Sequence, residues 1–220
     1  MNCYTKTPSG DSSQNLTNAP WNNVNVPKVT GTPLTRAVSV AKYLVANAGL
    51  TKMQAAAVVG VYIDENNCNP ASYMKAEARG QGAKGTGGFG YGAGIASWTG
   101  AEFKNTALKQ AGFPPNTPIE SLNLDDQAKM VVGNINGNMK RYYDALRRCQ
   151  NIEDASATCV VLTYGVGHSK NWKTHPTPQE AQAASDYYGR ANDRSYGKST
   201  HHWNGYGRRL EYAKQVLALL

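Results

Sequence analysis

The most pronounced pattern in the chain is an apolar run that leads into two acids. Residues 53–63 read MQAAAVVGVYI, in which every residue except Gln54 is apolar or glycine, and Asp64 and Glu65 follow directly. A helix that is apolar on all sides is normally surrounded by protein. Thr51 can open this helix with Gln54 as its capping-box partner. The pattern therefore predicts a buried helix whose last turn carries Glu65.

Helical spacing of apolar residues continues through most of the chain after residue 33. A first helix is expected over 34–48, and it ends at Gly49, a plausible C-cap. Further helices are expected at about 100–111, at about 125–148 from a start at Asp125 or Asp126, at about 153–164, within 177–190 and at about 205–219.

Two stretches lack this helical pattern. Residues 70–97 are rich in glycine, which disfavours a helix, so they are expected to be irregular or to form short strands. Residues 1–32 are rich in Ser, Thr, Asn, Pro and Gly and are expected to form an N-terminal arm or linker. The sequence thus predicts one mainly α domain of the α+β kind over 33–220, with a glycine-rich insertion after the helix of Glu65.

Composition and charge narrow the class of protein. The chain of 220 residues has 40% hydrophobic and 17% charged residues, which is typical of a globular protein. No apolar stretch reaches the roughly 18–20 residues of a membrane span, and residues 1–20 show no signal peptide. The net charge of +8 favours a polyanionic partner, either nucleic acid or the anionic bacterial envelope.

Cysteines and histidines do not form a recognisable metal motif, so neither a metal nor another cofactor is expected. The four cysteines lack CxxC spacing, and no histidine lies in an HExxH arrangement. Cys149 and Cys159 are close enough in sequence to form a disulfide, and the reduced state is equally compatible with their spacing. Cys68 follows a helix end, where the negative end of the dipole disfavours a thiolate nucleophile. The four histidines of the chain are His168, His175, His201 and His202.

Glu65 is the main candidate for catalysis. Burial, the negative end of the helix dipole and the like charge of Asp64 would each raise the pKa of Glu65. A fraction of Glu65 would then remain protonated near neutral pH, as a general acid for a glycosidic oxygen requires. The simpler alternative is a carboxylate that caps the helix end or forms a surface ion pair and faces water.

The segment GFGYGAGIASWTG, residues 88–100, supplies candidate substrate-binding groups. Its alternating glycines, Gly94 among them, permit close approach of a ligand or of another backbone. Tyr91 and Trp98 offer ring faces on which a sugar could stack, and Ser97 and Thr99 offer hydroxyls. Taken alone, the segment would be better interpreted as a glycine-rich surface loop that carries incidental aromatic residues.

Together, these two segments resemble the phage tail lysozyme family. The resemblance rests on Glu-x-x-x-x-Pro from Glu65 to Pro70, followed by Gly-x-Gly-Ile-x-x-Trp-Thr-Gly from Gly92 to Gly100. It extends over about 34–219. The family commonly has Ser directly after the catalytic Glu and Gln directly before the Trp-Thr pair, where this chain has Asn66 and Ser97.

The resemblance implies a lysozyme-like fold and a virion-associated, bacteriolytic peptidoglycan hydrolase with Glu65 as general acid. It further implies cleavage of the β-1,4 bond between N-acetylmuramic acid and N-acetylglucosamine, the activity of a lysozyme or N-acetylmuramidase. The partners would be glycan strands of the bacterial cell wall and, through the arm of residues 1–32, other proteins of the phage tail. No nucleic acid and no membrane insertion are expected.

The second catalytic group is less well defined. Glu77 is the one acid between Asn66 and Gly100, which makes it a candidate base or electrostatic partner. The alternative is a solvated Glu77 that pairs with Lys75 or Arg79. Without a second carboxylate, the same acid would serve a lytic transglycosylase. A virion protein that only binds glycan is an alternative of another class. A nucleic-acid binder is less favoured, because no known binding motif accompanies the many tyrosines.

Overall fold

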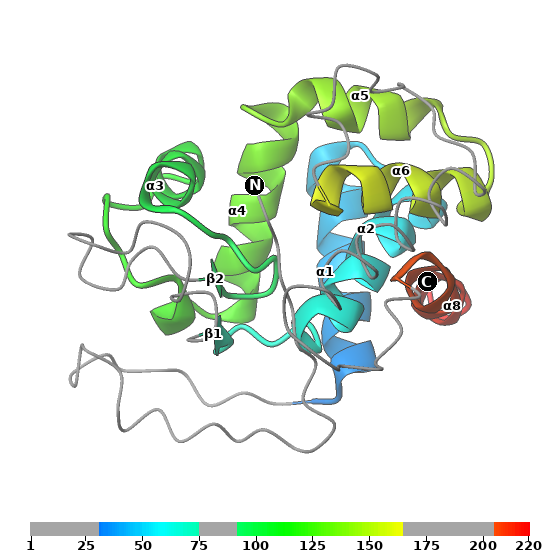
Figure 1. Cartoon of the computed structure of the whole chain (residues 1–220), viewed down its shortest axis with the longest axis horizontal. Coiled ribbons are helices and arrows are strands. Elements are labelled where there is room, and N and C mark those ends of the chain that lie inside the picture. Colours follow the sequence, from blue (N-terminus) through cyan, green and yellow to red (C-terminus); the bar gives the residue numbers. More distant parts are fainter. Residues whose placement is uncertain (1–30, 75–91, 165–204) are drawn as a thin grey trace, which may run out of the picture.

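The computed structural model describes residues 31–74, 92–164 and 205–220. In this part of the chain there are seven α-helices and one short pair of strands, which lies at one side of the molecule near α3 and α4 (Figure 1). The helices are α1 (Pro33–Ala48), α2 (Lys52–Asn66), α3 (Ala101–Gln110), α4 (Leu124–Asn136), α5 (Lys140–Arg148), α6 (Ile152–Tyr164) and α8 (Gly205–Leu217). A 3-10 helix spans Ile119–Ser121, and the strands are β1 (Tyr73–Met74) and β2 (Gly92–Ala93). The mainly α fold with a small β element is confirmed.

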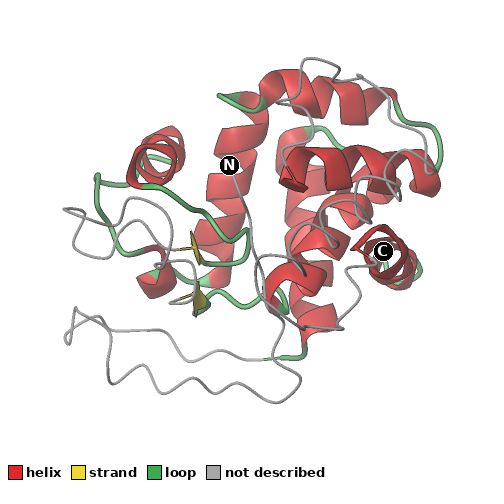
Figure 2. Cartoon of the chain, in the orientation of Figure 1, coloured by secondary structure: helices red, strands yellow, loops and turns green. Residues whose placement is uncertain are grey.

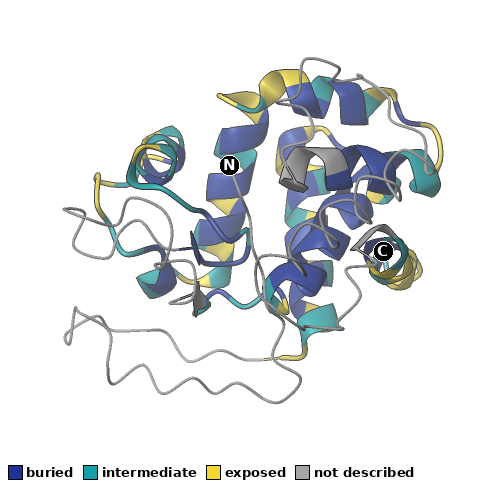
Figure 3. Cartoon of the chain, in the orientation of Figure 1, coloured by how far each residue is buried: buried dark blue, intermediate teal, exposed yellow. Residues whose placement is uncertain are grey.

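Helix α2 forms the centre of the core. It packs against α1, α6 and α8, and every residue from Gln54 to Glu65 is buried, as the dark blue of this helix shows (Figure 3). The capping box is present, because the Thr51 hydroxyl accepts from Gln54 N at 3.2 Å and Gln54 Oε1 accepts from Thr51 N at 3.0 Å. Gln54 Nε2 also donates to the Arg147 carbonyl at 3.0 Å, which satisfies the one polar side chain in the apolar run.

Most of the other predicted helices are confirmed. Helix α1 begins after the N-cap Thr32 with Pro33 in its first turn, and its C-cap residue is Gly49, whose φ of 64° is left-handed. Helices α3, α6 and α8 match three further predictions within a few residues. The helix expected within 177–190 and nearly all of the N-terminal arm lie outside the described residues.

The prediction of one helix over about 125–148 is wrong. Helix α4 starts from Asn123, whose side chain accepts from Asp126 N at 2.9 Å, and it ends at Asn136, before α5 begins at Lys140. At Gly137 the backbone leaves the helical conformation, with ψ at −120°. A Cβ atom at this position would lie 2.3 Å from the side-chain amide of Gln110 in α3. The apolar pattern continues across the break, so periodicity alone did not reveal it.

The glycine-rich insertion begins and ends in a two-stranded antiparallel ladder. Tyr73 pairs with Ala93 and Met74 with Gly92, and Figure 2 shows both strands beside one end of α4. This is consistent with the predicted irregular or short-stranded stretch, whose residues 75–91 lie outside the described part of the chain.

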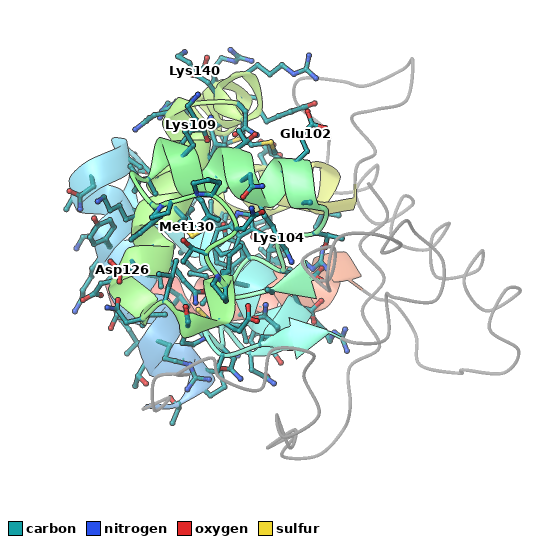
Figure 4. The ribbon with its side chains drawn as sticks, turned by 90° about the vertical axis from the view of Figure 1, so that its left-hand side faces the viewer. Glu102, Lys104, Lys109, Asp126, Met130 and Lys140 are labelled. Carbon is teal, nitrogen blue, oxygen red and sulfur yellow. The ribbon has the colours of Figure 1, made fainter. Side chains whose placement is uncertain are left out.

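Helix α3 covers α4 on the side of the molecule that carries the strands. Viewed from this side, Glu102 and Lys109 lie on the outer face of α3, whereas Lys104 points beneath the helix and is only 2% exposed (Figure 4). Met130 of α4 is fully buried in the core below. Within the described residues, no helix is both long enough and apolar enough to cross a membrane.

Candidate active site

The last turn of α2 places two carboxylates inside the protein. Asp64 is 7% exposed and Glu65 is 4% exposed. Helix α2 ends at Asn66, and its C-cap residue Asn67 has a left-handed φ of 61° and donates its N–H back to the Ile63 carbonyl at 2.9 Å. The predicted burial of Glu65 at the end of a buried helix is confirmed, and in this structure the side chain does not face water.

Two arginines of α8 neutralise these carboxylates. Arg209, only 1% exposed, binds Glu65 Oε1 through Nη2 and Asp64 Oδ2 through Nε, the latter at 3.1 Å. Arg208 binds Asp64 Oδ1 through Nε at 2.8 Å and is about half-exposed. Because buried charges are stable only when paired, this four-residue cluster accounts for two ionisable side chains in the core.

The ion pair with Arg209 changes the expected electrostatics of Glu65. Burial, the helix dipole and Asp64 favour the neutral acid, whereas an adjacent guanidinium favours the carboxylate. The first three influences are visible in the sequence around Glu65, whereas the fourth is not, because Arg209 lies 144 residues further along the chain. In the sequence, Arg209 is marked only by a weak clustering of arginines near the C-terminus.

Asn66 joins the end of α2 to the second segment of the resemblance. Its Nδ2 atom lies 2.6 Å from the Gly94 carbonyl, 3.1 Å from the Ile95 carbonyl and 3.0 Å from Ser97 Oγ. The two positions that depart from the family pattern are therefore bonded to each other. In this chain the amide of Asn66 follows the Glu and the hydroxyl of Ser97 precedes the Trp-Thr pair. In the family pattern given above, the hydroxyl follows the Glu and the amide precedes the pair.

The turn after Glu65 is held by an arginine of α1. Asn67 and Cys68 have positive φ values of 61° and 49°, a conformation that is costly for residues other than glycine. Arg36 donates from Nη2 to the Asn67 carbonyl and from Nε to the Cys68 carbonyl, each at 2.9 Å. Burial lowers the pKa of Arg36, with a smaller opposing influence of Cys68. The role of Arg36 was not predicted, because nothing in its neighbouring sequence marks it as a partner of this turn.

Gln127 of α4 also connects the segment after Glu65 to the segment that contains Gly94 and Ile95. Its fully buried side chain donates to the Pro70 carbonyl at 2.8 Å and accepts from Ile95 N at 2.9 Å. Gly94, with φ at 70°, lies directly against it, and a Cβ atom there would be 2.5 Å from Gln127 Oε1. The close approach predicted for Gly94 is therefore an approach of protein atoms.

The remaining predicted substrate-binding residues differ in their surroundings. Trp98 is 2% exposed and donates from Nε1 to Asn134 Oδ1 at 2.8 Å, so its ring packs in the core and offers no face to a sugar in this structure. The expectation of stacking on Trp98 is therefore corrected to a packing role. Ser97 is buried, and half-buried Thr99 donates to its carbonyl at 2.9 Å. Tyr91 and Glu77 lie outside the described residues.

The described residues contain no group of three or more His, Cys, Asp or Glu side chains that could hold a metal ion. All four histidines lie outside the described residues. Cys68, Cys149 and Cys159 are buried free thiols, so Cys149 and Cys159 do not form a disulfide in this structure. Burial raises the pKa of Cys68 to about 12, slightly offset by Arg36. This supports the exclusion of a Cys68 nucleophile, since the thiolate is the reactive form.

The three buried thiols are expected to resist modification in the folded protein. In a Cys3→Ser variant, an aromatic disulfide reagent at pH 8 should release its chromophore only after guanidinium chloride is added, because burial raises the pKa of each remaining thiol. Rapid reaction of the native protein would contradict the burial of these cysteines. A disulfide between Cys149 and Cys159 would instead lower the number of thiols counted after unfolding.

A mainly helical domain in which a buried glutamate ends the central helix beside a small β element is lysozyme-like. The sequence matches the model of the phage tail lysozyme family over residues 35–220, and the chain belongs to this family. No curated protein and no solved structure matched the chain. Family membership makes it a phage lysozyme-like peptidoglycan hydrolase of the glycoside hydrolase type, associated with the phage virion.

Proposed function

We propose that the protein is an N-acetylmuramidase that cleaves the β-1,4 bond between N-acetylmuramic acid and N-acetylglucosamine, with Glu65 as general acid. The observation that carries this proposal is the burial of Glu65 at the end of α2, held by Arg209 and followed directly by the Asn66 contacts to Gly94 and Ser97. A dry, fixed carboxyl group next to the family's second motif is suited to protonating a glycosidic oxygen.

In the proposed reaction, the protonated Glu65 transfers its proton to the glycosidic oxygen as the bond from the sugar carbon to this oxygen breaks. The leaving sugar departs as a neutral alcohol, and Glu65 becomes a carboxylate beside Arg209. Water then completes hydrolysis if a second carboxylate accepts its proton. We propose Glu77 for this role. Asp64 is engaged by Arg208 and Arg209, which suits it to hold Arg209 rather than to activate water.

A lytic transglycosylase is the alternative that the cluster favours next. Asp64, the neighbour of Glu65 on α2, is bound by two arginines and is therefore poorly suited to act as a base. In transglycosylation a hydroxyl of the substrate itself attacks, so one acid is sufficient. The net charge of +8 would attract either enzyme to an anionic cell wall.

Analysis of the ends of the cleaved glycan would test the proposed activity. Purified peptidoglycan would be digested, reduced with borohydride and examined by mass spectrometry. New muramitol ends are the expected result. Anhydro-muramyl ends would identify a lytic transglycosylase, and glucosaminitol ends would contradict cleavage of the proposed bond. Sedimentation of the protein with insoluble peptidoglycan, without release of sugar, would identify a virion component that only binds glycan.

A further inference from the structure

Helices α2 and α8 approach each other closely at Gly60. A Cβ atom on Gly60 would lie 2.6 Å from the Arg209 carbonyl oxygen and 2.9 Å from Ala213 N. Real Cβ atoms do not come this close to another backbone, so only glycine permits this separation of the two helices. The contact lies about one helical turn before the buried acids, because residues four apart lie on the same face of a helix.

The ends of α8 show that it runs antiparallel to α2. Near its start, Arg209 reaches the carboxylates at the end of α2. At the far end, Lys52 Nζ in the first turn of α2 donates to the carbonyl of Leu220 at 2.5 Å. An ion pair of 2.9 Å from Lys214 to Glu153 also ties α8 to α6. The backbone contact at Gly60 therefore sets how far the Arg209 guanidinium extends toward Glu65.

We propose that Arg209 is a positioning residue for Glu65 and that α8 acts as its carrier; this inference rests on the proposed function. The guanidinium holds Glu65 Oε1 and so fixes the rotation of the carboxyl group. The proton that Glu65 donates is then carried by Oε2. Once this proton has moved to the glycosidic oxygen, the positive charge of Arg209 stabilises the carboxylate that remains.

Asp64 has the opposite influence in this arrangement. It shares Arg209 through Nε and also binds Arg208, so part of the positive charge near Glu65 is neutralised. A general acid must be protonated before it reacts, and a fully effective cation would remove its proton too easily. Arg209 therefore lowers the pKa of Glu65 and makes it a stronger acid, whereas Asp64 limits this effect and so preserves the fraction of Glu65 that is protonated.

Three other charged groups packed near α2 have partners of their own. Lys214 and Glu153 pair with each other, and Arg36 of α1 binds the carbonyls after the helix end. Cys159 of α6 lies close enough to Arg209 to feel its charge, although burial has the larger effect and raises the pKa of this thiol. Changes of charge at Arg209 and at Asp64, which both belong to the cluster, should alter the pH response of Glu65.

The pH profile of the reaction distinguishes this role from a purely structural one. Activity that depends on a general acid falls as pH rises through the pKa of the acid. Arg209→Gln removes a cation, so this basic limb should move to higher pH. Asp64→Asn removes an anion that competes for Arg209, so the limb should move to lower pH. Opposite shifts of the limb are the expected result.

Kinetic constants on a soluble glycan oligomer from peptidoglycan supply the second readout. Arg209→Lys keeps the charge but loses the planar guanidinium, so kcat should fall about 100-fold while KM changes little. Gly60→Ala displaces α8 without altering any charged group, and it should lower kcat and move the basic limb to higher pH. Arg147→Lys on α5 is the matched control, with an ion pair to Asp144 at 2.9 Å away from this cluster.

Glu65→Gln, measured in parallel, separates the two proposals. If Glu65→Gln remains active, the assignment of the acid itself fails. If Glu65→Gln is inactive while Arg209→Lys retains the wild-type kcat and Asp64→Asn retains the wild-type limb, only the role of Arg209 is overturned. Circular dichroism and thermal unfolding establish that each variant is folded. Should Arg209→Gln fail to fold, Arg209→Lys, Asp64→Asn and Gly60→Ala still decide the outcome.

Discussion

Replacement of Glu65 by glutamine lowers the rate of peptidoglycan cleavage by about 10²–10⁴-fold, the usual contribution of a general acid. Glutamine has nearly the same size and keeps an oxygen that can accept from Arg209, but it has no proton to donate at neutral pH. The remaining charge on Arg209 is still met by Asp64 at 3.1 Å, so the cluster should remain assembled. A zymogram with purified murein, followed by rate measurements, would record the loss.

Glu211→Gln is the matched control for this variant. Glu211 lies on the exposed side of α8, where it accepts from Gln215 Nε2 at 3.3 Å and makes no contact with the buried acids. The same change of charge at this position should leave the rate within a factor of about two of the wild type. Full clearing by a folded Glu65→Gln protein would end the assignment of Glu65 as the acid.

The largest loss of stability is expected from Gln127→Leu. The Gln127 side chain donates to the carbonyls of Pro70, Ile119 and Leu122 and accepts from Ile95 N, with every distance between 2.8 and 3.0 Å. Leucine is similar in size but leaves these buried backbone groups without their partner. A buried group left unsatisfied costs about 1–3 kcal/mol, so the free energy of unfolding should fall by about 3–5 kcal/mol.

Thermal unfolding measures this effect directly. A loss of this size corresponds to a fall in Tm of roughly 10 °C for a chain of about 200 residues. Gln215→Leu, on the exposed side of α8, is the matched control and should change Tm by no more than about 1–2 °C. Activity should also fall in Gln127→Leu, since Pro70 and Ile95 belong to the two segments that border Glu65. An unchanged Tm would contradict the supporting role of Gln127.

The helices that the sequence predicted well carry their signals in neighbouring residues. The capping box of Thr51 and Gln54 and the C-cap at Gly49 depend on hydrogen bonds and backbone angles within a few residues. The all-round apolar character of α2 indicated its burial and therefore the burial of Glu65. Where a local signal was weaker than the apolar periodicity, as at Gly137 between α4 and α5, the prediction was wrong.

The electrostatics of the site could not be predicted in this way. Asp64 and Glu65 are adjacent, and their mutual influence is visible in the sequence, whereas Arg209, which binds both, lies 145 and 144 residues further along the chain. The role of Trp98 could not be predicted either, because an aromatic residue beside glycines can stack on a sugar or pack in the core. Its burial and its bond to Asn134 Oδ1 become apparent only once α4 is packed beside it.

The sequence by itself determined the order of most helices, the burial of Glu65 and the family of the protein, because all three depend on local patterns of side chains. Tertiary structure alone decided that Glu65 shares Arg209 with Asp64 and that Arg36 and Gln127 hold the segments around Glu65. It also decided that α8 packs directly against α2 at Gly60, which has no side chain. These contacts join parts of the chain that no local signal connects. Their energies depend on distance in space, which only the folded chain establishes.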